Sequence, residues 1–205
     1  MMKNTNIIIV GVGGQGILLT SKILGYLALD MGEQVKVSEV HGMSQRGGSV
    51  ITHVRIGQDV HSPLVDPGEA DFVLSFEKLE ALRAEHYLKK GGVLISNTQE
   101  ILPMPVIMGN TAYPDKAPES ENAVMLDALD LAEKAGSARA VNIVLLGVLS
   151  RFLSWPQEKW ESAVAACVPP KTLESICAPF GRALKGNEHD EKRDLGSQSR
   201  NHVPG

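Results

Sequence analysis

The chain has 205 residues, with 20 Lys plus Arg, 24 Asp plus Glu and a formal net charge of −4. This balance gives no electrostatic reason to expect nucleic acid as a partner, and no Lys/Arg cluster favours an anionic membrane surface. Two cysteines are too few for a four-thiolate iron–sulfur cluster or a disulfide framework, so we expect no metal site and reduced structural thiols.

Neither a signal-peptide pattern nor an apolar run of membrane-spanning length is found. We therefore expect a cytoplasmic protein with no membrane segment.

Strands and helices alternate in the first part of the chain. Residues 7–10 are a β-branched run ending at Gly11, which is typical of a strand buried on both faces. Residues 17–31 are apolar around most of the helix circumference and predict a buried helix that ends near Gly32. Residues 35–40 predict a second strand. Strand, glycine turn, helix and strand form a βαβ unit, which implies parallel strands.

The middle of the chain continues the α/β pattern. In residues 50–56 a mainly apolar set, Val50, Thr52, Val54 and Ile56, alternates with Ile51, His53 and Arg55, which predicts an antiparallel strand at a sheet edge with one wetter face. Buried strands are predicted over residues 71–76 and 92–97, with a helix over residues 78–89 between them. Residues 98–120 contain four prolines and indicate a loop with room for one short strand.

Helices dominate the remainder. Residues 121–135 predict an amphipathic helix, and residues 140–153 predict a helix that is apolar nearly all round, buried in the core or at a subunit interface. Shorter helices are expected over residues 156–166 and 171–184. Together these elements predict one α/β domain over residues 1–185: Rossmann-like, three-layered, with a mostly parallel sheet, an antiparallel edge and C-terminal helices. Residues 186–205 are nearly devoid of apolar side chains, so we expect a disordered tail.

A glycine turn between the first strand and the first helix is the first candidate site. The pattern G-x-G-x-x-G lets the backbone approach an anion closely, and the free N–H groups of the helix start point at it. We expect a phosphate or diphosphate here; the alternative is that the glycines only permit a tight turn and close packing. The candidate residues are Gly11, Gly13, Gly14, Gln15 and Gly16.

The loop after the second strand is the second candidate site. Arg46 offers a planar fork of donors suited to phosphate or carboxylate, and Ser44 and Gln45 add neutral donors. Gly47 and Gly48 allow backbone N–H groups to converge on an anion. The alternative is an ordinary connection with one surface arginine.

Further polar residues remain possible site members. Glu39 ends the second strand, where an acidic residue of a dinucleotide-binding fold accepts hydrogen bonds from a ribose, and His41 follows it. Asn97 stands at the carboxyl end of a strand, which is the ligand side of an open α/β sheet. No histidine has a recognisable catalytic partner in the sequence, so we assign no catalytic residue.

The two candidate loops together carry a family resemblance. Residues 8–16 and 39–50 resemble the gamma-type domain of 2-oxoacid:acceptor oxidoreductases, most closely the beta-subunit family of indolepyruvate ferredoxin oxidoreductase. Residues 136–147 are similar to the family's segment entering its apolar helix, and the resemblance extends over roughly residues 6–184.

The resemblance implies a subunit of an oxidoreductase of EC class 1.2.7, inactive on its own. The complete enzyme would oxidatively decarboxylate indolepyruvate or another 2-oxoacid to an acyl-CoA and reduce ferredoxin. Thiamine diphosphate, magnesium and 4Fe-4S clusters would belong to a partner alpha subunit. Coenzyme A would lie at the subunit boundary, facing residues 13–16 and 44–48.

Two other functions remain open on the sequence. One is a stand-alone NAD-dependent dehydrogenase with Glu39 on the ribose. The other is a non-catalytic nucleotide-binding or regulatory module.

Overall fold

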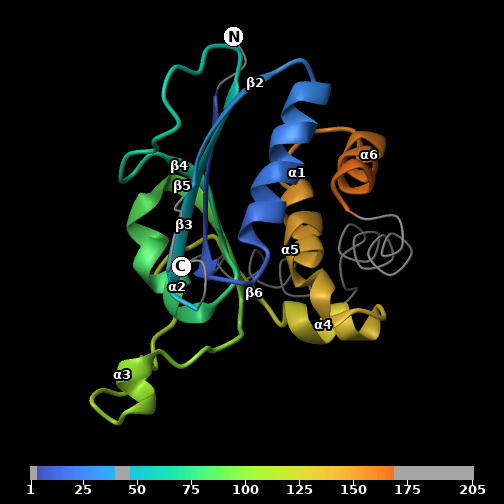
Figure 1. The fold of residues 1–205 in the computed structure, drawn as a ribbon. Coiled ribbons are helices and arrows are strands. Elements are labelled where there is room, and N and C mark those ends of the chain that lie inside the picture. Colours follow the sequence, from blue (N-terminus) through green and yellow to red (C-terminus); the bar gives the residue numbers. More distant parts are fainter. Residues whose placement is uncertain (1–3, 40–46, 169–205) are drawn as a thin grey trace, which may run out of the picture.

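A mixed sheet forms the middle layer of the molecule, which a computed structural model describes over residues 4–39 and 47–168 (Figure 1). The six strands of this part of the chain lie in the order β2-β3-β1-β4-β5-β6. Their bounds are β1 Thr5–Val12, β2 Gln34–Glu39, β3 Ser49–Gly57, β4 Ala70–Ser75, β5 Leu88–Asn97 and β6 Ala123–Leu126. Strands β1, β4, β5 and β6 are parallel, whereas β3 is antiparallel to both of its neighbours, β1 and β2.

The position of β3 corrects the predicted sheet. Strand β2 runs in the same direction as β1, as the βαβ pattern implies, but β3 separates the two. The antiparallel direction predicted for residues 50–56 is confirmed, but the edge strand on this side of the sheet is β2. The wetter face of β3 carries His53, which accepts a hydrogen bond from Val65 N, and Arg55, which donates to Leu64 O. Its polar residues therefore bind the covering loop over residues 58–69 instead of facing solvent at an edge.

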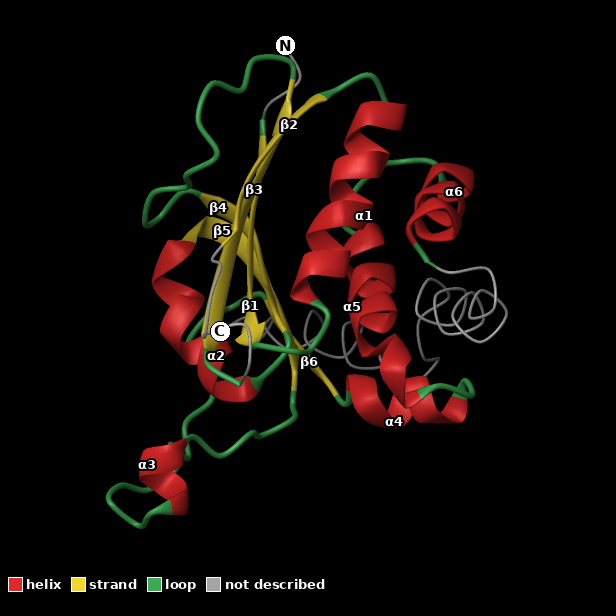
Figure 2. Ribbon diagram, in the orientation of Figure 1, coloured by secondary structure: helices red, strands yellow, loops and turns green. Residues whose placement is uncertain are grey.

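Helices cover both faces of the sheet, so the predicted three-layer α/β class is confirmed (Figure 2). On one face lie α1 (Ile17–Asp30), α4 (Ala128–Lys134), α5 (Val141–Ser150) and α6 (Gln157–Cys167). On the other face lies α2 (Lys78–Ala84), which ends in the 3-10 turn η2 (Glu85–Tyr87). A second 3-10 turn, η3 (Ala138–Ala140), leads into α5. The short helix α3 (Met104–Ile107) lies on an arm, formed by residues 102–112, that projects from the body.

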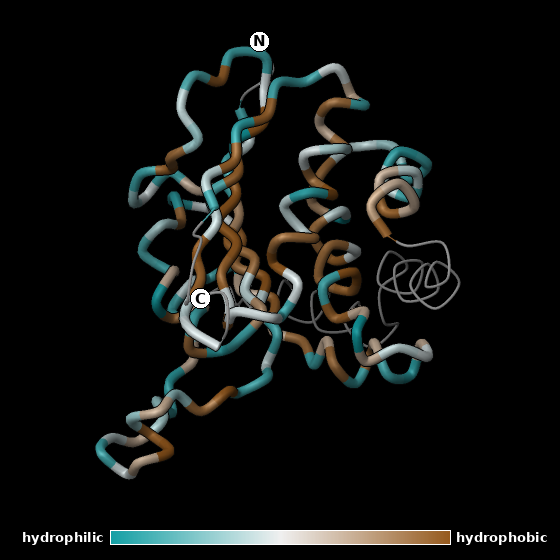
Figure 3. Tube along the Cα trace, viewed as in Figure 1, coloured by the Kyte–Doolittle hydropathy of each residue, from teal (hydrophilic) through white to brown (hydrophobic). Residues whose placement is uncertain are grey.

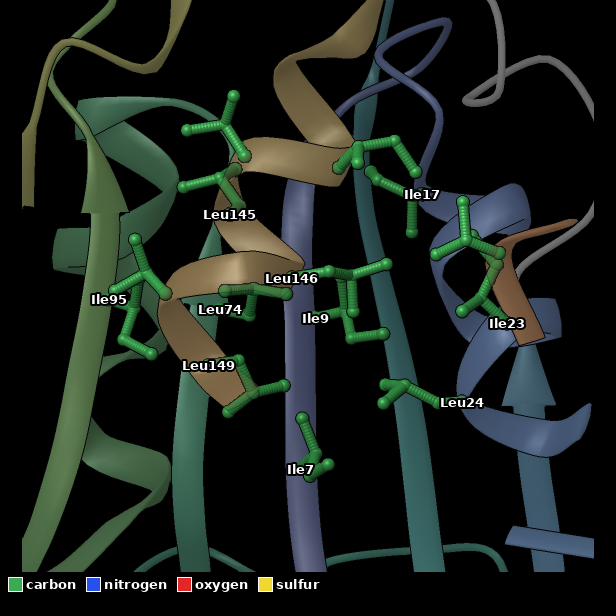
Figure 4. Packing of buried hydrophobic residues seen from close by; sticks show 14 of the residues in the cluster. Ile7, Ile9, Ile17, Ile23, Leu24, Leu74, Ile95, Leu145, Leu146 and Leu149 are labelled. Carbon is green, nitrogen blue, oxygen red and sulfur yellow. The ribbon is translucent and has the colours of Figure 1, made fainter. Parts of the chain in front are cut away.

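The core is largely aliphatic and lies mainly between the sheet and the α1–α5 layer (Figures 3 and 4). Ile7 and Ile9 of β1 point into this layer and are fully buried with Leu24, Leu145 and Leu149. Each such side chain stabilises the fold by about 1.5–3 kcal/mol relative to exposure. The residues of α5 from Asn142 onward are all buried within this chain. Of the two places predicted for this helix, the core is the observed one, so α5 is not part of an exposed subunit surface.

Three element boundaries differ from the sequence prediction. The helix expected over residues 78–89 ends earlier, because Leu88 already pairs with Ala70 as the first residue of β5. The helix expected over residues 121–135 divides into β6 and α4, since β6 pairs with β5 and Asp127 caps α4 by accepting from Asp130 N at 2.9 Å. Residues 98–120 contain α3 and no strand.

The helices expected over residues 17–31 and 156–166 are confirmed as α1 and α6. Residues 171–184 and the tail over residues 186–205 lie outside the described part of the chain. Among the described helices, none combines the length and apolarity needed to cross a bilayer.

Candidate functional site

The two glycine segments singled out in the sequence lie side by side at the carboxyl end of β1. Gly13 N donates to Gly48 O at 2.8 Å, and Gly47 N donates to Gly13 O at 3.1 Å. Gly14, Gly16 and Gly47 have φ angles of 104°, 90° and 87°, a left-handed region that favours glycine. Because their N–H groups are paired, Gly13 and Gly47 fix one loop against the other. The remaining residues predicted for this site, namely His41, Ser44, Gln45 and Arg46, lie outside the described residues.

A cavity of about 340 Å³ opens at the start of α1. Helix α1 has Gly16 at its N-cap, no capping side chain and no acidic residue in its first turn. The first N–H groups of a helix have no intrahelical acceptor, and with the helix dipole they favour an anion. The arrangement therefore fits a phosphate group. The cavity is lined by Gly13, Gly14, Gly16, Ile17, Leu18, Leu19 and Val50.

The side chain of Gln15 is folded back into the turn. Its Oε1 accepts from Val12 N at 2.7 Å, and its Nε2 donates to Phe76 O at 3.1 Å and to Gln99 Oε1 at 3.3 Å. A Cβ on Gly11 would lie only 2.8 Å from Gln15 Oε1 and from Phe76 Cβ, so glycine is required there for this close approach. Gln15 thus joins the turn to the segments that follow β4 and β5.

Asn97 lies at the carboxyl end of β5, as the sequence indicates, but it is fully buried. Its Oδ1 accepts from Ala128 N at 3.1 Å, and its Nδ2 donates to Phe76 O at 3.2 Å. These bonds tie the end of β5 to the start of α4 and to the same carbonyl that Gln15 binds. The amide of Asn97 is therefore engaged in hydrogen bonds within the protein.

A buried carboxylate at the start of α2 was missed by the sequence analysis. Glu77 accepts from Glu80 N at 3.0 Å, from Ile101 N at 3.0 Å and from the Tyr113 hydroxyl at 2.5 Å. Burial, reinforced by the hydrogen bond to Glu77, raises the pKa of Tyr113, so this hydroxyl remains a donor. The signal that was available is a Glu-x-x-Glu pattern directly after a predicted strand, which resembles a helix-capping sequence.

A second buried carboxylate, Glu80, holds the segment after Gly48. It accepts from Ser49 Oγ at 2.5 Å and from Arg83 Nη1 at 2.6 Å. Because Ser49 is the first residue of β3, this contact fixes the position at which β3 begins, directly after Gly47 and Gly48.

Glu39 is the last residue of β2, which β3 separates from β1. Its carboxylate accepts a hydrogen bond from Ser21 Oγ of α1, in a cavity of about 490 Å³ between α1 and β2. In a dinucleotide-binding fold the strand bearing the acidic residue is the direct neighbour of β1. Here β3 intervenes, so the backbone of β2 is about 10 Å from β1 instead of about 5 Å. This geometry does not favour the NAD-dependent alternative.

The three histidines and the one cysteine in the described part of the chain have structural or surface contacts. His53 is half-buried and accepts from Val65 N at 3.2 Å, and burial lowers its pKa. His61 pairs with Asp59 on the surface, and His86 Nδ1 lies 2.8 Å from Arg83 O. Burial raises the pKa of the Cys167 thiol. Within residues 4–39 and 47–168, no group of three or more His, Cys, Asp or Glu side chains is arranged to hold a metal ion.

Residues 6–185 match the family model described as pyruvate ferredoxin/flavodoxin oxidoreductase. The chain is 46% identical over 194 residues to the indolepyruvate oxidoreductase subunit IorB of Thermococcus kodakarensis, covering 90% of this chain and 96% of that subunit. It is similar in fold to a keto/oxoacid ferredoxin oxidoreductase gamma subunit from Geobacter sulfurreducens, with a TM-score of 0.67, 24% identity and coverage of 89% and 99% of the two chains.

A third similarity is to the 2-oxoglutarate:ferredoxin oxidoreductase of Magnetococcus marinus, solved with 2-oxoglutarate, coenzyme A and succinyl-CoA bound. The TM-score is 0.71 at 18% identity, over 90% of this chain and 31% of that one. The fold and the glycine turn define a Rossmann-like α/β domain with room for a phosphate at the start of α1. The chain belongs to the pyruvate ferredoxin/flavodoxin oxidoreductase family.

Proposed function

We propose that this chain is the cluster-free subunit of a 2-oxoacid:ferredoxin oxidoreductase that acts on indolepyruvate or a related aryl pyruvate. The observation that carries the proposal is the 46% identity to an indolepyruvate oxidoreductase subunit along 96% of that subunit's length. In the complete enzyme, the chain would support oxidative decarboxylation of the 2-oxoacid to an acyl-CoA.

The glycine turn is the part of this chain that fits coenzyme A. When bound, coenzyme A supplies the thiol that accepts the acyl group. Gly13, Gly14 and Gly16 leave space for its phosphates beside the first N–H groups of α1. At about 340 Å³ the cavity is small among ligand pockets, which usually measure about 300–1,000 Å³. We therefore infer that it holds the phosphate portion and that the rest of the coenzyme lies at the boundary with the partner subunit.

The redox cofactors belong, in this proposal, to an alpha subunit that carries thiamine diphosphate, magnesium and 4Fe-4S clusters and passes electrons to ferredoxin. The two cysteines of the whole sequence fall short of the four thiolates that one such cluster takes. We place the assembly in the cytoplasm.

The projecting arm offers a surface for the alpha subunit. Leu102, Met104, Ile107 and Met108 are exposed on it, although each is a large apolar side chain. Clustered exposed apolar residues are typical of protein–protein contact sites. In this proposal the arm contacts the alpha subunit. The helix predicted over residues 140–153, which was the earlier candidate for a subunit interface, is buried in the core.

Co-expression tests the proposal. The full-length chain with an affinity tag should co-purify with the thiamine- and cluster-bearing alpha subunit. The complex should reduce ferredoxin only when indolepyruvate and coenzyme A are both present. The chain alone should show neither this activity nor tight binding of NADH by calorimetry. Failure of the two subunits to associate at micromolar concentration would contradict the proposal.

A further inference from the structure

Three segments that lie far apart in the sequence are hydrogen-bonded to one short stretch, residues 76–80, in which β4 passes into α2. They are the glycine turn over residues 11–16, the start of β3 directly after Gly48, and the two ends of the arm over residues 102–112. The arm projects from the end of the molecule at which β1 and β4 end (Figure 2). We call residues 76–80 the junction.

The arm is bonded to the junction at both of its ends. The carboxylate of Glu77 accepts from Ile101 N at 3.0 Å before the arm and from the Tyr113 hydroxyl at 2.5 Å after it. The same hydroxyl accepts from Leu79 N at 3.0 Å, so Tyr113 contacts the start of α2 twice. The base of the arm therefore cannot move without displacing the junction or breaking these bonds.

The two glycine segments are bonded to the same junction. Phe76 O accepts from Gln15 Nε2 of the glycine turn at 3.1 Å. Glu80 Oε2 accepts from Ser49 Oγ at the start of β3 at 2.5 Å. Because the two segments also bond each other through their backbones, a displacement of the junction acts on both of them together.

Glu77 and Glu80 belong to the same turn at the start of α2. Glu77 is the N-cap of this helix and accepts from Glu80 N at 3.0 Å. The two residues are only 1% and 4% exposed, and a buried polar group that loses its hydrogen bond destabilises the fold. We therefore expect a small shift at the base of the arm to move this turn as a unit.

We propose that the junction couples the position of the arm to the conformation of the two glycine segments, with Glu77 and Glu80 as positioning residues. A partner that binds the arm then changes the glycine turn without touching it. Coupling between two sites is reciprocal, so a change at the start of β3 also reaches the arm. The alpha subunit as the partner and the coenzyme as the ligand rest on the proposed function, whereas the coupling rests on contacts within this chain.

Hydrogen exchange of the full-length chain, followed for single amides by NMR, tests the coupling from the side of the arm. Tyr113→Phe removes the hydroxyl that joins the arm to the junction and keeps the ring. The amides of Val12 and Gly13, which are hydrogen-bonded within the glycine segments, should then exchange about threefold faster or more, because local opening of these bonds becomes easier. Tyr26→Phe, at an exposed position on α1, is the matched control and should leave both rates unchanged.

A second variant tests the coupling in the opposite direction and decides the matter if Tyr113→Phe does not fold. Ser49→Ala removes the donor to Glu80. By reciprocity, the amide of Ile101, which donates to Glu77 at the base of the arm, should exchange faster. Ser154→Ala, at an exposed position before α6, is the control and should leave this rate unchanged.

Amides that pair β2 with β3 report opening of the whole fold, since β2 is the strand farthest from the arm on this side of the sheet. In Tyr113→Phe they should keep their exchange rates. Equal acceleration of these amides and of Val12 and Gly13 would overturn the proposal, because it indicates a general loss of stability. Unchanged exchange at the reporter amides of either folded variant would overturn it as well.

The outcomes separate this inference from the proposed function. The exchange measurements need neither a partner subunit nor a coenzyme, so a failure to assemble with the alpha subunit leaves the coupling standing. Conversely, glycine segments that do not respond to the arm remove the coupling and leave the subunit assignment untouched.

Discussion

The side-chain amide of Gln15 joins the ends of three strands. It bonds within its own turn, to Phe76 O after β4 and to Gln99 after β5. The glycines of this turn could be predicted from sequence because G-x-G-x-x-G after a strand requires particular backbone conformations. The role of Gln15 could not, since its partners lie 61 and 84 residues away along the chain. Likewise, the partner of Asn97 in α4 is 31 residues distant.

Gln15→Ala should lower the free energy of unfolding by about 1–3 kcal/mol. The substitution leaves Val12 N without its side-chain acceptor and leaves Phe76 O with the bond from Asn97 Nδ2 alone, and a polar group that loses its partner carries that cost. Urea unfolding followed by circular dichroism measures it. Gln58→Ala is the matched control, because the side chain of Gln58 bonds to Glu33 at an exposed position, and its effect should stay within about 0.5 kcal/mol. Equal losses in the two variants would rule out a structural role for Gln15.

His53 should make stability depend on pH. Burial lowers its pKa below the ordinary 6.5, so the unfolded chain takes up a proton at a higher pH than the folded chain does. The contribution of His53 to stability therefore falls as pH drops below about 6.5, until the folded histidine is protonated as well. His53→Asn retains an acceptor for Val65 N and does not titrate. Unfolding measured from pH about 7 to about 5 should show a shallower loss of stability in the variant, and parallel curves would contradict this.

At the scale of elements, the arm over residues 102–112 is held at its base and exposed at its tip. Glu77 accepts from Ile101 N before the arm and from the Tyr113 hydroxyl after it, so one buried carboxylate anchors both ends. The sequence predicted a loop here from its prolines. It did not predict the anchor, because Glu77 precedes Tyr113 by 36 residues.

Polar substitution at the tip of the arm should weaken assembly without affecting the fold. Ile107 and Met108 are 61% and 66% exposed, so replacing both with serine removes little burial within this chain. If the arm packs against the alpha subunit, their loss should weaken association at least tenfold, or about 1.4 kcal/mol, as measured by surface plasmon resonance. Leu29→Ser on α1, 67% exposed, is the control for losing an apolar side chain elsewhere. Unchanged association of the double variant would exclude the arm from the interface.

The sequence prediction was wrong for a short element: β6 was predicted as part of a helix over residues 121–135. Strand β6 has only four residues, and apolar runs of that length suit a strand or a helix equally well. The strand conformation of this segment is determined by its pairing with the neighbouring β5, in which Leu94 pairs with Ala123 and Asn97 pairs with Leu126. The longer helices α1 and α6 were predicted closely because their patterns extend over several turns.

At the scale of the whole molecule, the α/β class followed from the alternation of elements, whereas the lateral order of strands did not. The sequence of β3 gives the strand one buried and one less buried face. That pattern is equally compatible with an edge strand and with a strand that has a neighbour on each side. The actual position of β3 depends on the loop over residues 58–69, which binds the wetter face. That position also moves Glu39 away from β1, so the same feature that escaped the sequence analysis weighs against dinucleotide binding.

The central place of β1 has a consequence for how the chain folds during translation. Ile7 pairs with Val54 on one side and with Phe72 on the other, so neither neighbour exists when β1 leaves the ribosome. At a synthesis rate of about 5–20 residues per second, this apolar strand waits several seconds for its partners. Nascent chains halted before β4 is made should therefore be aggregation-prone and rely on chaperones, while chains that include β4 can close the sheet around β1.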